Sequence, residues 1–360
     1  MQPENYCPDC DGVPGRHSIG EPLPRRDFVR VVGLGAVAAT VGALPGSARA
    51  ADKAQPESLV KKLYESFTPD QKKEVCFEWD YKDDRGLLRT HVSNNWNVTV
   101  PEQLNVAGKF FTGDQQEIIR EIFLGLYNPD WHERILKQLQ DDAGGYGKSQ
   151  TIALFGEPGT GKFQFLMTGR HLTIRCDGDS AAHVAFGGPI FYGHAASGFN
   201  EKVGHPGNVF WHQAQKANSL FKMLDGKQRE QALVMKGPPE ADVPLRGPQA
   251  EIPGVLIGEM TSDQKTHAQE ILKALLDPYR VSDRSEAMKC LDAQGGLDKC
   301  RLVYYRQDSK GESADLGDDG EWDNWRLEGP SLVWHYRGVP HVHVWVNVAD
   351  DPSVALNAKG

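Results

Sequence analysis

Residues 151–176 read TIALFGEPGTGKFQFLMTGRHLTIRC, and this stretch decides the fold. The runs Thr151–Phe155, Phe163–Thr168 and His171–Cys176 are short, contain β-branched and aromatic residues, and are separated by turns that contain glycine. Such runs are typical of strands joined as antiparallel hairpins. The same pattern predicts further strands at Ala182–Phe186, Arg301–Arg306, Leu327–Tyr336 and His341–Val348. Because helical segments flank these hairpins, we predict an α+β fold with an antiparallel sheet.

The segment Gly156–Lys162, between the first two runs, matches most of the phosphate-loop motif. That motif continues with Ser or Thr, whose hydroxyl binds Mg²⁺, but here the next residue is Phe163. It also requires a following helix, whose N-terminus faces the phosphates, whereas the residues from Phe163 onward alternate like a strand. The sequence therefore predicts a hairpin loop here and no nucleotide cofactor.

Helix starts repeat one signature along the chain. A Thr followed three residues later by Gln, with Asp between them, forms a capping box at Thr68, Thr112 and Thr261, and Asp225 begins a looser copy. Apolar stripes at helical spacing follow, and further helices are predicted at Trp131–Leu139 and Trp211–Leu224. The repeats indicate either an internal duplication or independent use of a good cap. Their irregular spacing favours the second interpretation.

Composition limits the classes of function. The chain has 360 residues, of which 39% are hydrophobic and 25% charged, as in a soluble globular protein. Its formal net charge of -9 argues against a nucleic-acid partner, since such binding needs clustered positive charge. The length allows one large domain or two domains of about 150 residues each.

The N-terminus has the pattern of an export signal. The pair Arg25-Arg26 precedes the apolar run 31–44, and Ala48-Arg49-Ala50 matches an A-x-A cleavage site. We expect residues 1–50 to be a twin-arginine signal peptide with an N-terminal extension, recognised by the twin-arginine export machinery. Residues 51–360 would then form a single large α+β domain, periplasmic or extracellular, with no stable membrane span after cleavage. An uncleaved N-terminal anchor is the alternative.

Four cysteines follow the signal. Cys290 and Cys300 flank a Gly-Gly turn, and in an oxidising compartment this arrangement favours a disulfide between them. Cys76 and Cys176 lie in apolar surroundings and are predicted to be buried thiols.

The histidines near the C-terminus carry the clearest chemical pattern. His341 and His343 are two residues apart and therefore share one face of a strand. A turn centred on Gly338 would place His335 opposite His341, within reach of one metal ion. His171 and His194 lie in two further glycine-containing clusters that could complete the site. Neutral imidazole is a good ligand for zinc, copper or iron, but these histidines could also be buried residues held by hydrogen bonds.

Several short motifs, in their order along the chain, resemble the family known as domain of unknown function 3500. They are Phe67–Gln71, Phe155–Pro158 with Phe163, Gly169–Leu172, Gly188–Gly193, Gly329–Ser331 and His341–His343. The resemblance implies an exported protein and accounts for the incomplete phosphate loop. Members often have two adjacent histidines where this chain has Arg170-His171. The family supplies no established reaction.

Two classes of function follow from these observations. The first is an exported metal-binding protein whose ligands are His171, His341 and His343, with His335 and His194 next. Its metal could activate water for hydrolysis or serve an oxidoreductase, so both reaction classes stay open. The second is a non-catalytic extracytoplasmic binding module for an unknown small molecule, with an aromatic groove formed by Trp325, Trp334, Tyr336 and Trp345.

Overall fold

A computed structural model describes residues 55–195, 208–315 and 320–359. The predicted signal peptide, with Arg25 and Arg26, lies outside the described residues. The helices are α1 (Pro56–Ser66), α2 (Pro69–Val75), α3 (Pro101–Leu104), α4 (Gly113–Gly125), α5 (His132–Ala143), α6 (Trp211–Met223), α7 (Gly226–Ala232), α8 (Ser262–Leu276) and α9 (Val281–Ala293). Among the described helices, none combines the length and apolar character that crossing a bilayer requires.

The strands are β1 (Cys76–Phe77), β2 (Lys82–Asp83), β3 (Gly86–Leu87), β4 (His91–Ser93), β5 (Gln150–Gly156), β6 (Phe163–Gly169), β7 (Leu172–Cys176), β8 (Ile190–His194), β9 (Leu233–Lys236), β10 (Val255–Leu256), β11 (Arg301–Gln307), β12 (Asn324–Gly329), β13 (Leu332–Arg337), β14 (Val342–Val348) and β15 (Asn357–Lys359). Eleven of these described strands form one sheet, in the order β1-β5-β6-β7-β8-β14-β13-β12-β11-β10, with β9 also paired to β11. The fold is α+β, as predicted.

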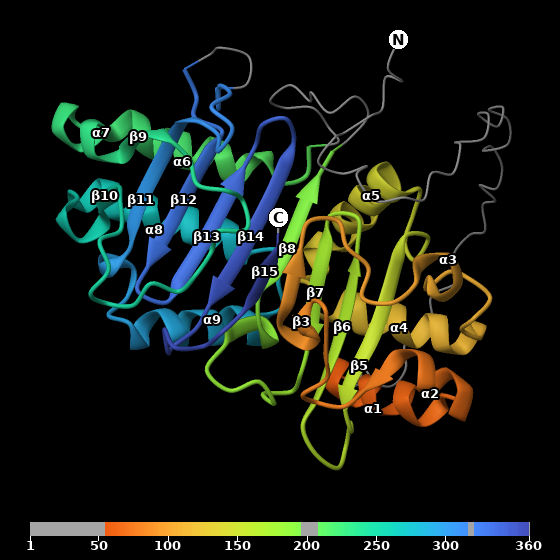
Figure 1. Ribbon diagram of the computed structural model, residues 1–360. Helices are drawn as coiled ribbons and strands as arrows, with labels where there is room; N and C mark the ends of the chain where they lie inside the picture. The colour runs from red at the N-terminus through yellow and green to blue at the C-terminus, as the bar shows by residue number, and fades with distance from the viewer. Residues whose placement is uncertain (1–54, 196–207, 316–319, 360) are drawn as a thin grey trace, which may run out of the picture.

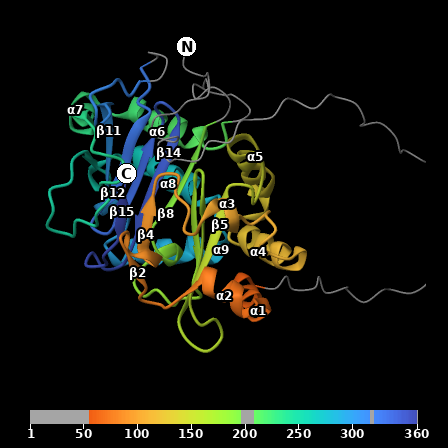
Figure 2. The ribbon, with the colours of Figure 1, turned by 45° about the vertical axis from the view of Figure 1, so that its right-hand side comes forward.

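The two faces of this sheet differ. In Figure 1 the helices α5, α6, α8 and α9 lie behind the sheet, and β4 and β15 lie in front of it. Figure 2 shows the same layers from an oblique angle. The helix side holds the large apolar core, which includes Leu154, Phe165, Trp334 and Val346. On the opposite side, Trp345 packs with Phe191 and with Val92 of β4 in a small separate cluster.

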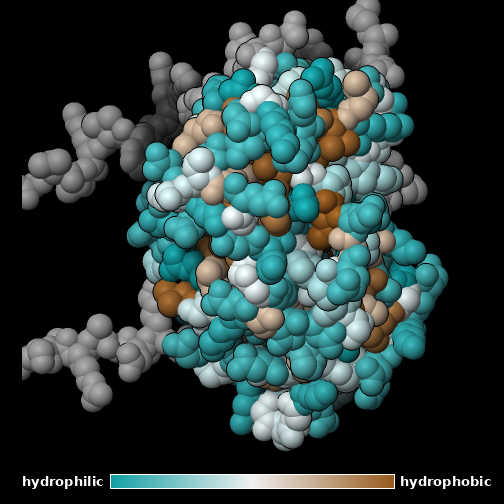
Figure 3. All heavy atoms as spheres, turned by 90° about the vertical axis from the view of Figure 1, so that its left-hand side faces the viewer, coloured by the Kyte–Doolittle hydropathy of each residue, from teal (hydrophilic) through white to brown (hydrophobic). Residues whose placement is uncertain are grey.

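One side of the molecule shows how its exposed apolar residues are distributed. On the side of the molecule that Figure 3 shows, hydrophobic residues form separate small patches among polar ones. Scattered exposed apolar side chains are normal for a folded protein and indicate no particular partner.

The chain is built from two similar halves. Each half runs from a capped helix into a short strand, β1 or β9, that pairs in parallel with the first strand of a four-stranded antiparallel meander. The meanders are β5-β6-β7-β8 and β11-β12-β13-β14, and they meet where β8 pairs antiparallel with β14. Because equivalent strands meet antiparallel and helices cover the same face, the halves are related by an approximate two-fold rotation.

The capping boxes support this duplication over independent use of one cap. In the first half, Gln71 and Gln115 donate side-chain hydrogen bonds to each other at 2.9 and 3.0 Å. In the second half, Gln228 and Gln264 do the same at 3.0 and 2.8 Å. Each glutamine also closes its own capping box, so all four boxes occupy matching places in the two halves.

Three of the local expectations are wrong. Ala182–Phe186 is not a strand; the chain forms a 3-10 turn at Ala185–Gly187, because Phe186, Gly187 and Gly188 have positive φ angles that a strand does not allow. Leu327–Tyr336 is two strands, since a turn at Gly329–Leu332 separates β12 from β13. The expected disulfide is not formed: Cys290 and Cys300 are free buried thiols. Cys300 comes directly before β11, and its sulfur lies 2.8 Å from the position that a Cβ atom at Gly329 would take.

The segment Gly156–Lys162, which partly matches the phosphate-loop motif, is a hairpin loop, as predicted. Gly156 and Phe163 form the last pair of the β5–β6 ladder, where the loop joins the strands. The N–H of Glu157 donates to the carbonyl oxygen of Lys162. The strand β6 follows directly. Cys176 is buried as expected, and Cys76 is partly buried.

Candidate metal centre

Three histidine rings converge near the place where β8 ends and β14 begins. These strand ends lie at the upper end of the sheet in Figure 1. The Nε2 atom of His343 lies 3.2 Å from Nε2 of His171 and 2.8 Å from Nε2 of His341. The ligand atoms of all three lie within 4.8 Å of one another, in an arrangement that could hold a metal ion. All three side chains are buried, at 0–2% exposure. The three histidines therefore form one enclosed cluster, which we call the histidine cluster.

Local backbone structure explains how the rings meet. His171 is the second residue of a two-residue turn closed by the Gly169–Leu172 pair, and its φ angle is 52°. Its N–H donates to Oδ1 of Asn95 at 2.8 Å, which fixes this left-handed conformation. His343 is the second residue of β14, and His341 comes one residue before this strand. As predicted from their spacing, both side chains point to the same place.

Two carboxylates hold the far sides of the rings. Oδ2 of Asp142, near the end of α5, lies 2.8 Å from Nδ1 of His171. Oε2 of Glu240, in the connector after β9, lies 2.8 Å from Nδ1 of His343. Glu240 is held in turn by Arg337 and by the indole N–H of Trp345. Carboxylates placed behind histidines in this way are the usual outer shell of a metal site.

This arrangement sets the protonation of the rings. Each carboxylate accepts a hydrogen bond from the Nδ1–H group, so Nε2 of His171 and of His343 presents a lone pair to the centre of the cluster. Burial lowers the pKa of His171 despite the opposing effect of Asp142. Burial and the charge of Arg337 lower the pKa of His343, and burial with the neighbouring histidines lowers that of His341. All three rings are therefore neutral near pH 7.

The centre of the cluster is suited to a cation. The lone pairs on Nε2 of His171 and of His343 face each other at 3.2 Å and repel, and a positive ion between them removes that repulsion. Zinc–imidazole bonds of about 2.0–2.1 Å in a tetrahedral ion place the nitrogens about 3.3 Å apart. The separation of 3.2 Å between Nε2 of His171 and of His343 is close to this value, and the 2.8 Å between His341 and His343 is shorter.

His335 and His194 lie outside the group of three. His335 shares a face with His343, as its parity predicts, but its partner across the ladder is Trp345 rather than His341. The pairing ends at Arg337 and His343, because the connection contains Pro340, which has no N–H to donate to a ladder. His335 instead lies 3.0 Å from the guanidinium of Arg326. His194 is the last residue of β8, with Nδ1 3.6 Å from Oδ1 of Asp142.

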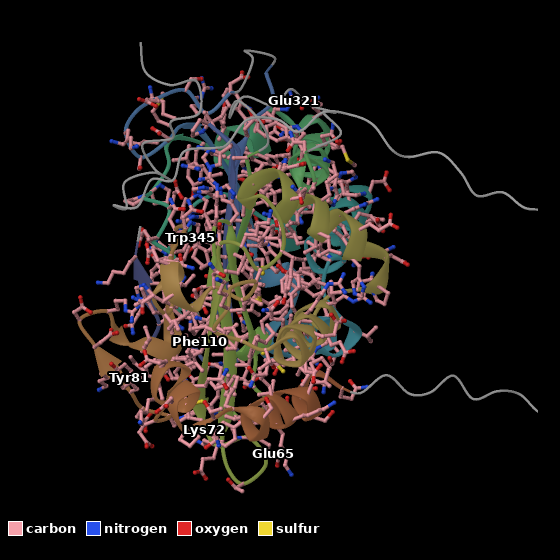
Figure 4. All side chains as sticks on the ribbon, turned by 90° about the vertical axis from the view of Figure 1, so that its right-hand side faces the viewer. Glu65, Lys72, Tyr81, Phe110, Glu321 and Trp345 are labelled. Carbon is pink, nitrogen blue, oxygen red and sulfur yellow. The ribbon has the colours of Figure 1, made fainter. Side chains whose placement is uncertain are left out.

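The four aromatic residues that were expected to form a ligand-binding groove lie in the interior. Trp325, Trp334 and Tyr336 are fully buried, and Trp345 is 1% exposed. In Figure 4, Trp345 lies at about mid-height, between Glu321 near the top and Lys72 near the bottom. These side chains pack the sheet and do not line an exposed groove.

Sequence reasoning missed both carboxylates. Asp142 sits at the end of an amphipathic helix, where acidic residues are common, and Glu240 sits in a proline-rich connector. Neither position carries a local signal, because the contacts that matter span 29 and 103 residues of sequence.

Comparisons with known proteins identify the family and nothing closer. The family model described as "Protein of unknown function (DUF3500)" matches residues 54–338, which include His171, Asp142 and Glu240. The match ends three residues before His341. No curated protein and no solved structure matches the chain. The matched region covers most of the chain, and this protein therefore belongs to the DUF3500 family of proteins of unknown function.

Proposed function

We propose that the protein binds one transition-metal ion, with zinc, copper and iron as candidates, through Nε2 of His171, His341 and His343. The supporting observation is the convergence of three buried, neutral imidazoles, two of which have a carboxylate behind them. Neutral nitrogen ligands suit these ions, whereas magnesium and calcium prefer oxygen.

We further propose that the bound ion activates water for hydrolysis. Three protein nitrogens leave one position of a tetrahedral ion for water or substrate, which is the arrangement of catalytic rather than structural zinc sites. Such an ion lowers the pKa of its bound water to about 7. Asp142 and Glu240 would keep the imidazoles oriented and strengthen them as ligands. Redox chemistry is the alternative if copper or iron is the ion found.

The first test is elemental analysis of the purified mature chain, before and after incubation with zinc, copper or iron salts. We expect one ion per chain in the wild type and none in His343→Ala. His267→Ala is a matched control, because His267 lies on α8 and is bonded to the carbonyl oxygen of Lys216. Wild-type protein that takes up none of the three metals would contradict the proposal.

A second test separates binding from catalysis. Hydrolysis of an activated ester should fall when a chelator removes the ion and return when zinc is added. Stoichiometric metal without metal-dependent hydrolysis would retain the metal site and reject the hydrolytic role.

Export is proposed separately, on the basis of the N-terminal sequence. We expect the native protein to begin at Ala51, and replacement of both Arg25 and Arg26 by Lys to block its export. N-terminal sequencing of each protein checks this, and an intact Met1 on a soluble cytoplasmic protein would contradict it.

A further inference from the structure

A second cavity lies on the face of the sheet away from the core helices. Its volume is about 390 Å³, and it is formed by β9, the connector that follows it, β11 and β12. Its apolar walls are Val234, Pro238, Pro253 and Tyr305, and its charged residues are Lys236, Arg246, Arg326 and Glu328. It shares no residue with the histidine cluster.

Arg326 is the unusual group in this cavity. It lies on β12 and is 1% exposed. Its Nη2 donates to the carbonyl oxygen of Asp242 at 2.6 Å and lies 3.0 Å from Nδ1 of His335. Its Nε is buried and has no hydrogen-bond partner among the described residues. A buried charged donor that lacks a partner is costly, so an acceptor at this position would be favourable.

The charges of the cavity leave a positive excess. Glu328 is 1% exposed and is shared by two guanidiniums, with Nε of Arg246 at 2.8 Å and Nη1 of Arg326 at 3.7 Å. Lys236 adds a third cation at the rim. Nη2 of Arg246 also lies 3.6 Å from Oδ2 of Asp242, which is partly exposed. Two carboxylates therefore face three cations, and one anion bound here would complete their neutralisation.

We propose that this cavity binds a small organic anion whose carboxylate meets Arg326 and Arg246 and whose apolar body lies against Tyr305 and the prolines. A guanidinium pairs well with a carboxylate because its planar donors match the two oxygens. The apolar walls favour a ligand with a hydrocarbon or aromatic body over a bare inorganic anion. The site is distinct from the metal centre and does not depend on it.

The test uses benzoate as the probe, with benzamide as its uncharged analogue. Each is titrated by calorimetry into the metal-free mature chain. We expect saturable binding of benzoate, at least tenfold weaker binding of benzamide, and at least a tenfold loss of benzoate affinity in Arg246→Gln. Equal binding of the two probes, or no saturable binding of benzoate, would overturn the proposal.

Two controls locate the binding. Arg284→Gln should retain benzoate affinity, because Arg284 is as exposed as Arg246 and also pairs with an acid, but it lies on α9. His341→Ala should also retain it. Loss of benzoate binding in His341→Ala would assign the anion to the histidine cluster and overturn the second site. Since Arg246 has one third of its side chain exposed, its replacement leaves the buried Arg326 in place and tests the site in a folded protein.

Discussion

The two ends of the sheet are built on the same plan but carry different chemistry. At one end, Asp142 near the end of α5 accepts the N–H of Ala195 at 2.9 Å and holds Nδ1 of His171. At the other end, Gln294 directly after α9 accepts the N–H of Ser331 at 2.5 Å and donates to the carbonyl oxygen of Ala349 at 2.5 Å. In each half, the end of a helix contacts the turn between the second and third strands of the meander. It also contacts the residue that follows the fourth strand.

The difference shows how one end came to support a metal site. The glutamine uses its donor and its acceptor on backbone groups, so its role is structural. The aspartate uses one oxygen on the backbone, and its other oxygen orients an imidazole. His341 comes directly before β14 and His343 is its second residue. The corresponding positions at β8 are Pro189 and Phe191, which offer no ligand. A common framework therefore carries a ligand cluster at one end and backbone bracing at the other.

The largest effect is expected from removing the ligand that differs between the ends. His171→Asn should abolish stoichiometric metal binding, while Ser331→Ala at the matching turn should leave it unchanged. Asn tolerates the left-handed conformation of His171, so the turn should be retained. Elemental analysis with circular dichroism checks both points. Equal metal content in the two variants would break the comparison.

A smaller effect is expected from the residues that brace the two ends. Asp142→Asn should weaken metal affinity by about 10–100-fold, the usual cost of losing an outer-shell partner. Gln294→Glu should leave the affinity within about twofold, because Gln294 lies at the opposite end of the sheet. Competition with a chromophoric chelator measures both. A wild-type affinity in Asp142→Asn would show that this carboxylate does not support the ligand.

Matched substitutions in the two halves should have similar effects on stability where the two structures are alike. Gln115→Ala and Gln264→Ala each remove the side-chain oxygen that accepts the N–H of the N-cap threonine, and one member of a glutamine pair. We expect each to lower the free energy of unfolding by about 1–3 kcal/mol. Urea unfolding followed by tryptophan fluorescence gives both values. A large loss in one variant and none in the other would argue against equivalent roles.

The smallest effect concerns a carboxylate at the end without the histidine cluster. Oε2 of Glu286 on α9 accepts the N–H of Phe186, and burial with the nearby charge of Asp177 raises the pKa of Glu286 to about 7 from 4.5. The folded protein therefore holds this proton more tightly than the unfolded chain, and the free energy of unfolding should fall as pH rises from about 4.5 to about 7.

Replacing this carboxylate tests the effect. Glu286→Gln should reduce the loss of stability over that pH range by on the order of 1 kcal/mol, a figure that allows for solvent screening. Urea midpoints at several pH values measure it, with Glu270→Gln on the exposed side of α8 as control. An identical pH profile in wild type and Glu286→Gln would contradict the raised pKa.

Local patterns predicted much of the secondary structure and part of the site. The short apolar runs mark β5, β6, β7 and β11, because glycine-containing turns separate them, and the capping boxes mark four helix starts. The parity of His341 and His343 was sufficient to place both on one side of β14. These features depend on neighbours within a few residues.

The remaining features depend on long-range contacts that no local pattern records. The register that gives His335 the partner Trp345 follows from the length of the loop around Pro340. Asp142 and Glu240 reach the cluster only after the sheet has assembled. The similarity of the two halves was hidden by the irregular spacing of the capping boxes and became clear from the glutamine pairs.

The central claim is that His171, His341 and His343 together bind one metal ion. X-ray absorption spectroscopy of the zinc-loaded mature chain measures the ligands of that ion directly. We expect three imidazole nitrogens at about 2.0–2.1 Å, plus one light-atom ligand from water, with the spectrum lost in His343→Ala. A first shell that contains sulfur or mainly oxygen, or an unchanged spectrum in His343→Ala, would contradict it.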